Sequence, residues 1–116
     1  MPSLVAAAHG AEVTAADWAE DAIELLVRNA ERNGLRVRAE VRDWRDPWHE
    51  RFDLALAADV LYEHRNVEPL VAILPRLAPQ TLLGLAARPH EREVLDRLPN
   101  EPIAERVVRL RPPARL

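Results

Sequence analysis

Segments that fit strands alternate with segments that fit helices along this chain, and this alternation most restricts the fold. The strand-like runs cover residues 12–16, 37–41, 52–58, 81–87 and 103–110. The helix-like runs cover residues 2–9, 20–33, 66–77 and 89–98. Such an order is typical of βαβ units. It predicts an α/β chain with a Rossmann-like, doubly wound, mostly parallel sheet.

Three of these segments carry sharper expectations. Val37, Ala39 and Val41 alternate with charged residues, which predicts a strand at a sheet edge with one solvated face. Phe52–Ala58 is almost entirely apolar, which predicts a strand buried on both faces. Asn66 precedes an apolar stripe at helical spacing, so its side chain is expected to cap the following helix.

Composition narrows the class of protein. A length of 116 residues fits one domain, and we take residues 1–116 as a single unit. The net charge of −3 favours neither nucleic acid nor an anionic membrane as a partner. The chain has no cysteine, its four histidines lack ligand spacing, and no metal site is expected. No apolar run approaches the length of a membrane span, so a cytoplasmic protein is the default expectation.

Acidic residues follow three of the expected strands. They are Asp17, Asp43 and Asp59. In open α/β sheets ligands bind outside the carboxyl ends of the strands, where an acid commonly accepts hydrogen bonds from ribose hydroxyls. Asp17 fits this role, and it equally fits a cap for the next helix.

The other two acids each have an aromatic neighbour. The Trp44 indole beside Asp43 could lie against a purine, or it could pack with Trp48 in a small core. Asp59 with Tyr62 could hold an amine or ammonium group, or the two could cap and pack the turn after the strand. The residues alone leave both choices open.

Taken together, these pieces resemble the class I, seven-stranded S-adenosylmethionine-dependent methyltransferases. The nearest likeness is the branch of non-histone protein-lysine methyltransferases and nicotinamide N-methyltransferase-like proteins, over residues 2–88. Its motifs are residues 2–7, residues 13–18, Asn29-Ala30, Asn33-Gly34, Asp43-Trp44 and Asp59-Val60-Leu61-Tyr62. The last is similar to the acid-x-x-tyrosine motif of that branch.

The resemblance implies a role for each residue of the candidate site. Asp17 with Trp18 would hold the ribose of S-adenosylmethionine, and Asp43 with Trp44 would flank its adenine. Ala58 and Asp59 would lie near the methionine part of the cofactor. Asp59 and Tyr62 would border the acceptor amine and act as the catalytic residues. The substrate would be an amine on a protein or a small molecule, with a protein lysine side chain as one candidate.

The chain departs from this family before its first helix. Its three glycines, Gly10, Gly34 and Gly84, are far apart, so the first strand and glycine-rich loop of the family are not found. We therefore expect a partial methyltransferase domain, truncated at its N-terminus, whose full-length form transfers methyl groups to an amine. The alternative is a non-catalytic remnant that binds a partner chain through open sheet edges. A dinucleotide-binding domain is disfavoured, because its fingerprint loop is also absent.

Overall fold

The chain forms two compact units, and each is described here by itself. The computed structural model describes residues 2–58, 60–61 and 63–113. The first unit is Met1–Asp46, and the second is Pro47–Leu116. The expectation of one domain over residues 1–116 stays a prediction.

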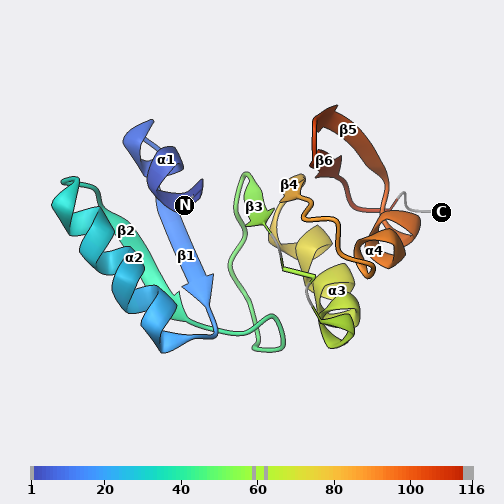
Figure 1. Cartoon of the computed structure of the whole chain (residues 1–116), viewed down its shortest axis with the longest axis horizontal. Helices are drawn as coiled ribbons and strands as arrows, with labels where there is room; N and C mark the ends of the chain where they lie inside the picture. The colour runs from blue at the N-terminus through green and yellow to red at the C-terminus, as the bar shows by residue number, and fades with distance from the viewer. Residues whose placement is uncertain (1, 59, 62, 114–116) are drawn as a thin grey trace. The chain divides into compact units, whose positions relative to one another are not determined.

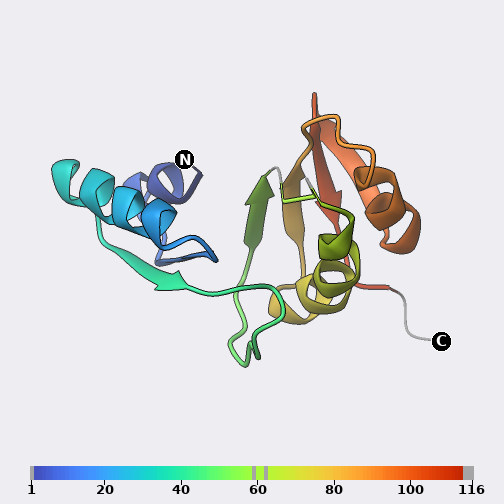
Figure 2. The same ribbon diagram turned by 60° about the horizontal axis from the view of Figure 1, so that its bottom comes forward.

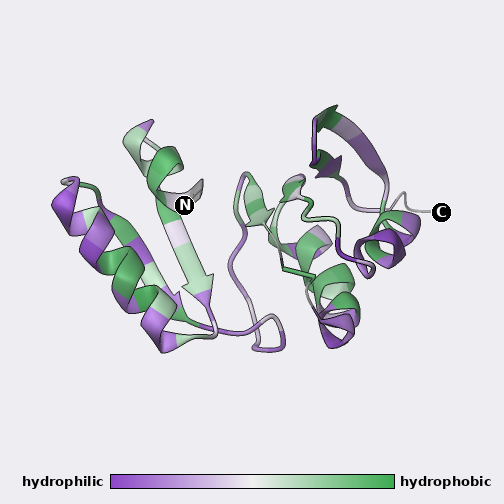
Figure 3. Cartoon of the chain, in the orientation of Figure 1, coloured by the Kyte–Doolittle hydropathy of each residue, from purple (hydrophilic) through white to green (hydrophobic). Residues whose placement is uncertain are grey.

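The first unit is a βαβ crossover preceded by a short helix (Figure 1). Its elements are α1 (Pro2–Ala8), β1 (Val13–Asp17), α2 (Glu20–Arg32) and β2 (Val37–Val41). The two strands pair in parallel, with Val13 opposite Val37 and Asp17 opposite Val41. Helix α2 carries alternating hydrophobic and hydrophilic bands (Figure 3), and it buries Leu26 and Ala30. The segments expected at 20–33 and 37–41 are thus confirmed within one residue.

The end of α2 explains why a glycine stands at position 34. Gly34 has a φ of +63°, a left-handed conformation that L side chains rarely adopt. The Gly34 amide donates to the Glu31 carbonyl at 3.1 Å, and the Leu35 amide donates to the Ala30 carbonyl at 2.9 Å. These two bonds form a Schellman motif, which stops the helix and turns the chain into β2.

Strand β2 has the edge position that its pattern predicts, since within the described residues it pairs with β1 alone. Its charged face is less solvated than expected. Glu40 lies between Arg38, at 3.0 Å, and Arg42, at 3.1 Å, and the Arg42 side chain is only 17% exposed. Val41, on the apolar face, is 53% exposed. Pairing lets Glu40 and Arg42 lie close to the protein, whereas the Arg38 side chain stays 78% exposed and the apolar face is covered only in part.

The second unit is a mixed sheet with two helices, whose arrangement is clearest in Figure 2. Its elements are β3 (Ala55–Ala58), a 3-10 turn η1 (His64–Asn66), α3 (Val67–Leu77), β4 (Thr81–Gly84), α4 (Glu91–Arg97), β5 (Asn100–Ala104) and β6 (Val107–Leu110). The strand order is β3-β4-β6-β5, with β3 and β4 parallel and the other pairs antiparallel. The parallel pairs β1–β2 and β3–β4, each joined through a helix, confirm the α/β, Rossmann-like class.

The core of this unit lies on one face of its sheet. Thr81, Leu83, Val108 and Leu110 are buried, and Leu74 of α3 and Leu98 after α4 line the same region as Thr81 and Leu110. On β3, Leu56 points to the opposite face and is 43% exposed. The prediction that residues 52–58 form a strand buried on both faces is therefore wrong. The strand is four residues long, and in this unit helices cover only one face.

Two further expectations fail in the second unit. Residues 103–110 are not one strand, because Arg106, with a φ of +59°, turns the chain between β5 and β6 to make a hairpin. The Asn66 side chain makes no capping bond at α3. Instead its amide donates to the Val60 carbonyl at 3.0 Å, and Asn66 is 4% exposed. The Asn66 side chain could bond either to the first turn of α3 or to another backbone group, and the fold brings the Val60 carbonyl within its reach.

Candidate functional site

The first unit brings Asp17 and Asp43 to the same end of its parallel strands. Asp17 lies opposite Val41, and the Arg42 amide donates to the Asp17 carbonyl at 2.9 Å. Asp43 follows directly. The carboxyl ends of the two strands therefore form one rim, which is where α/β sheets bind ligands.

Asp17 fixes the turn that leads from β1 into α2. Its Oδ1 accepts a hydrogen bond from the Ala19 amide at 2.9 Å, while the N-cap position itself is Ala19 and has no side-chain cap. Asp17 is expected to cap α2 as the alternative to binding ribose. Its side chain instead bonds to the backbone two residues further on, which is an Asx turn. This turn uses one carboxylate oxygen of a half-buried side chain. The second oxygen remains as an acceptor for a ligand hydroxyl.

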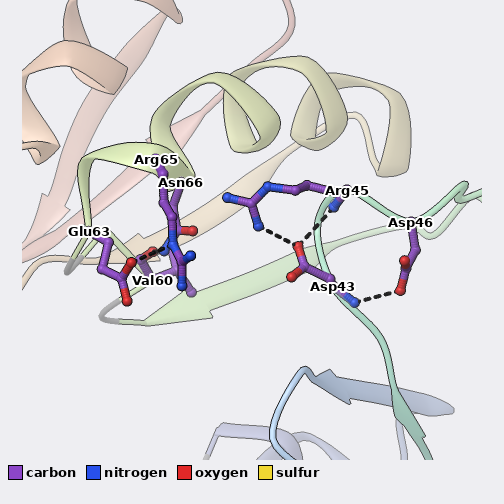
Figure 4. Close-up of polar contacts among 7 residues, drawn as sticks. All are labelled: Asp43, Arg45, Asp46, Val60, Glu63, Arg65 and Asn66. Carbon is purple, nitrogen blue, oxygen red and sulfur yellow. Dashed lines mark hydrogen bonds and ion pairs between the residues drawn. The ribbon is translucent and has the colours of Figure 1, made fainter.

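Asp43 opens a compact turn, drawn in Figure 4. Its Oδ1 accepts from the Arg45 amide at 3.0 Å and from Arg45 Nη1 at 2.9 Å. The Asp43 amide donates to Asp46 Oδ2 at 2.8 Å, and the Asp46 amide donates to the Asp43 carbonyl at 3.1 Å. These bonds hold the backbone around Trp44 in a defined shape. No pattern in the sequence predicted that Arg45 and Asp46 would bond to Asp43.

The two indoles of this rim differ in exposure. Trp18, next to Asp17, is 55% exposed, whereas Trp44 is half-buried. An exposed indole offers an apolar face on which a flat ligand ring can stack. The carboxyl ends of β1 and β2 therefore carry both acidic and aromatic side chains.

The second unit has a rim of its own at the carboxyl ends of β3 and β4. Gly84 ends β4 beside Ala58, and a Cβ on Gly84 would come within 3.3 Å of the Ala58 Cβ. The Asn66 bond to Val60 (Figure 4) holds the segment after β3, in which Glu63 and Arg65 form an ion pair. The predicted site residues Asp59 and Tyr62 lie outside the described residues. At this rim, sequence reasoning assigned Asn66 to a helix cap instead of the bond to Val60, and it missed Glu91.

Displaced pKa values occur on the second unit outside this rim. A hydrogen bond from Arg97 lowers the pKa of Glu68, and one from Arg109 lowers that of Glu101. Among the described residues, no group of three or more His, Asp or Glu side chains is placed to hold a metal ion. None of the described helices is long and apolar enough to cross a membrane.

The rim at the ends of parallel strands, with its acids and indoles, is typical of the Rossmann-like, S-adenosylmethionine-dependent methyltransferases. The model of the lysine methyltransferase family matches residues 3–94, and the chain belongs to that family. No curated protein and no solved structure matches the chain. Methyltransferases of this family generally use S-adenosylmethionine as the methyl donor.

Proposed function

We propose that this protein is an S-adenosylmethionine-dependent methyltransferase that acts on an amine, with a protein lysine side chain as acceptor. The single observation that carries the proposal is the family match over residues 3–94. The shared rim of Asp17 and Asp43 supports it, because two acids at neighbouring strand ends suit a nucleoside.

The adenosine part of the cofactor is assigned to the first unit. Asp17 accepts hydrogen bonds from the ribose hydroxyls while its other oxygen keeps the Ala19 turn. Trp18 lies against the ribose side, and Asp43 with Trp44 flanks the adenine. Charge-assisted hydrogen bonds of this kind contribute about 1.5–3 kcal/mol each.

The acceptor side is assigned to Ala58, Asp59 and Tyr62 by the acid-x-x-tyrosine motif. By this resemblance Ala58 would lie by the methionine part of the cofactor, Asp59 would orient the neutral amine, and Tyr62 would border that amine. When bound, the cofactor supplies an activated methyl group on a sulfonium, which passes to the amine nitrogen as its bond to sulfur breaks. The chain contributes mainly by placing the amine in line, and the amine proton leaves to solvent.

Calorimetry tests the cofactor site. We expect S-adenosylhomocysteine to bind the folded chain with micromolar affinity, and Asp17→Ala to weaken binding about 10- to 100-fold through the lost charge-assisted bonds. Asp96→Asn is the matched control, since Asp96 is an exposed acid on α4 whose side chain is 68% exposed. Unchanged affinity of Asp17→Ala would remove Asp17 from the site. A cooperatively folded chain without any binding would contradict the cofactor assignment.

The acceptor is tested with two peptides that differ only in lysine or arginine at one position. Methyl transfer from S-adenosylmethionine to the lysine peptide alone supports the proposal. Equal transfer to both, or transfer to neither by a chain that binds the cofactor, contradicts the lysine assignment.

A second candidate function is that of a protein-interaction module. Within the described residues β1 pairs with β2 alone and β3 with β4 alone, so each has one edge without a strand. Such edges accept an added strand from a partner. A folded chain that fails to bind S-adenosylhomocysteine would favour this function over the first.

A further inference from the structure

Glu91 is a buried carboxylate at the start of α4 that the proposed function does not use. The residue is 7% exposed. Its Oε2 accepts from the Ala86 amide at 2.7 Å, and its Oε1 accepts from the Arg88 amide at 3.1 Å. Both oxygens therefore hold the backbone of the loop that follows β4. Burying an acid is costly unless it is hydrogen-bonded in this way.

The same loop contains a residue, Ala87, in an unfavourable left-handed backbone conformation. Ala87, between the two bonded amides, has a φ of +58°, which costs free energy for a residue with a Cβ. Successive amides around such a residue form a concave site for an anion, and here the chain's own carboxylate fills it. The Glu91 amide also donates to the Arg88 carbonyl at 3.2 Å, which closes a turn with His90 at its third position.

His90 connects this loop to the segment that follows β3. Its ring lies 5.2 Å from the His64 ring, centroid to centroid, at an interplanar angle of 59°. His64 Nε2 is also 3.1 Å from Glu93 Oε2 on α4. His64 begins the 3-10 turn that ends at Asn66, whose amide holds Val60. The loop after β4 thus contacts the turn His64–Asn66, which follows the acid-x-x-tyrosine motif in the sequence.

We propose that Glu91 is a positioning residue for the acceptor side of the site. Its carboxylate fixes the loop 85–90, and the loop presents His90 to His64. This contact sets the turn His64–Asn66, whose Asn66 amide holds Val60. The role in methyl transfer rests on the proposed function. The mechanical part, the fixing of the turn His64–Asn66 by Glu91 through His90, stands on the geometry of the second unit alone.

Nuclear magnetic resonance of the full chain tests the mechanical part with two variants. Glu91→Gln keeps the shape of the side chain but turns a donor toward an amide, so we expect exchange of the Ala86 and Arg88 amides to rise about tenfold. The contact between the His64 and His90 rings should disappear, and the signals of 60–66 should shift. His90→Ala should shift the same 60–66 signals while the Ala86 and Arg88 amides stay protected.

Two outcomes would overturn this part of the proposal. One is retained protection of the Ala86 and Arg88 amides in Glu91→Gln. The other is unchanged 60–66 signals in His90→Ala, a variant that keeps the Glu91 bonds and so answers the question even where Glu91→Gln does not fold. Asp96→Asn, on the exposed face of α4, is the control for a charge change that leaves the loop alone.

Kinetics test the part that depends on the proposed function. With the lysine peptide as acceptor, we expect His90→Ala to raise KM for the peptide several-fold, while the affinity for S-adenosylhomocysteine stays within twofold. An equal loss of cofactor affinity, or an unchanged KM, would overturn the acceptor-side role. A wild-type chain inactive on the peptide would count against the proposed function, and the resonance experiment would still decide the mechanical part.

Discussion

The two units of this chain differ in how many apolar side chains they bury. Of the fourteen buried apolar residues among those described, three belong to the first unit, namely Ala15, Leu26 and Ala30. The remaining eleven belong to the second unit. The first unit also exposes large apolar side chains, among them Val5 at 60% and Leu25 at 51%. The rim assigned to the adenosine of the cofactor thus lies on the unit with the smaller core.

This contrast indicates which substitutions should lower stability and which should weaken ligand binding. In the second unit the eleven buried apolar side chains are constrained by packing, because burial of apolar area provides most of the stabilisation. In the first unit a few local turns, such as the Asp17 turn and the end of α2 at Gly34, fix the backbone around the rim. A substitution in the core should therefore act on stability, and one in the rim on binding.

The largest effect is expected from the core of the second unit. Leu70, on α3, is 1% exposed, and Leu70→Ala should lower the free energy of unfolding by about 2–5 kcal/mol through lost burial and a residual cavity. Leu26→Ala on α2, where the residue is 8% exposed, is the counterpart in the first unit and should cost less. Urea denaturation measures both, and equal losses would break the comparison between the units.

A smaller effect is expected at the end of α2. Gly34→Ala places a Cβ on a left-handed residue and should lower the free energy of unfolding by about 1–2 kcal/mol, although the space around it is open. Glu24→Ala, at an exposed position in the middle of α2, is the control and should change stability by less than about 0.5 kcal/mol. A neutral Gly34→Ala would show that the first unit does not depend on its Schellman motif.

The smallest effect concerns the ion pair between Glu68 of α3 and Arg97 of α4. The hydrogen bond and charge of Arg97 hold the pKa of Glu68 below its ordinary value of 4.5. A carboxyl pKa that is lowered in the folded state stabilises the fold at a pH above the ordinary pKa of 4.5. This contribution is lost as the pH falls through the folded-state pKa. Wild type should therefore be slightly more stable than Glu68→Gln at pH 7, and the difference should shrink as the pH falls below 4.5. A difference that persists in acid would assign the effect to packing.

Placement of the candidate site was predictable where it depends on parallel strands. Asp17 and Asp43 follow strands of one βαβ unit, and the carboxyl ends of parallel neighbours meet at one edge. Local sequence did not indicate the bonds of Asn66 and Glu91, since their partners Val60 and Ala86 are five or six residues away across irregular loops. The ligand roles of Asp17, Trp18, Asp43, Trp44, Ala58, Asp59 and Tyr62 stay predictions.

The sequence by itself determined the α/β alternation, the extent of α2 and β2, and the family. The alternation and the extent of these elements follow from hydrophobic periodicity and from residues close together in the chain, which act before any long-range contact forms. The family follows from the resemblance of short motifs such as Asp43-Trp44, and the family match over residues 3–94 agrees with it. Only the tertiary structure decided that β3 is covered on one face, that residues 100–110 form a hairpin, and that Glu91 fastens the loop after β4. Those features depend on which distant segments pack together, and a local pattern of apolar residues is the same whether one face or two will be covered.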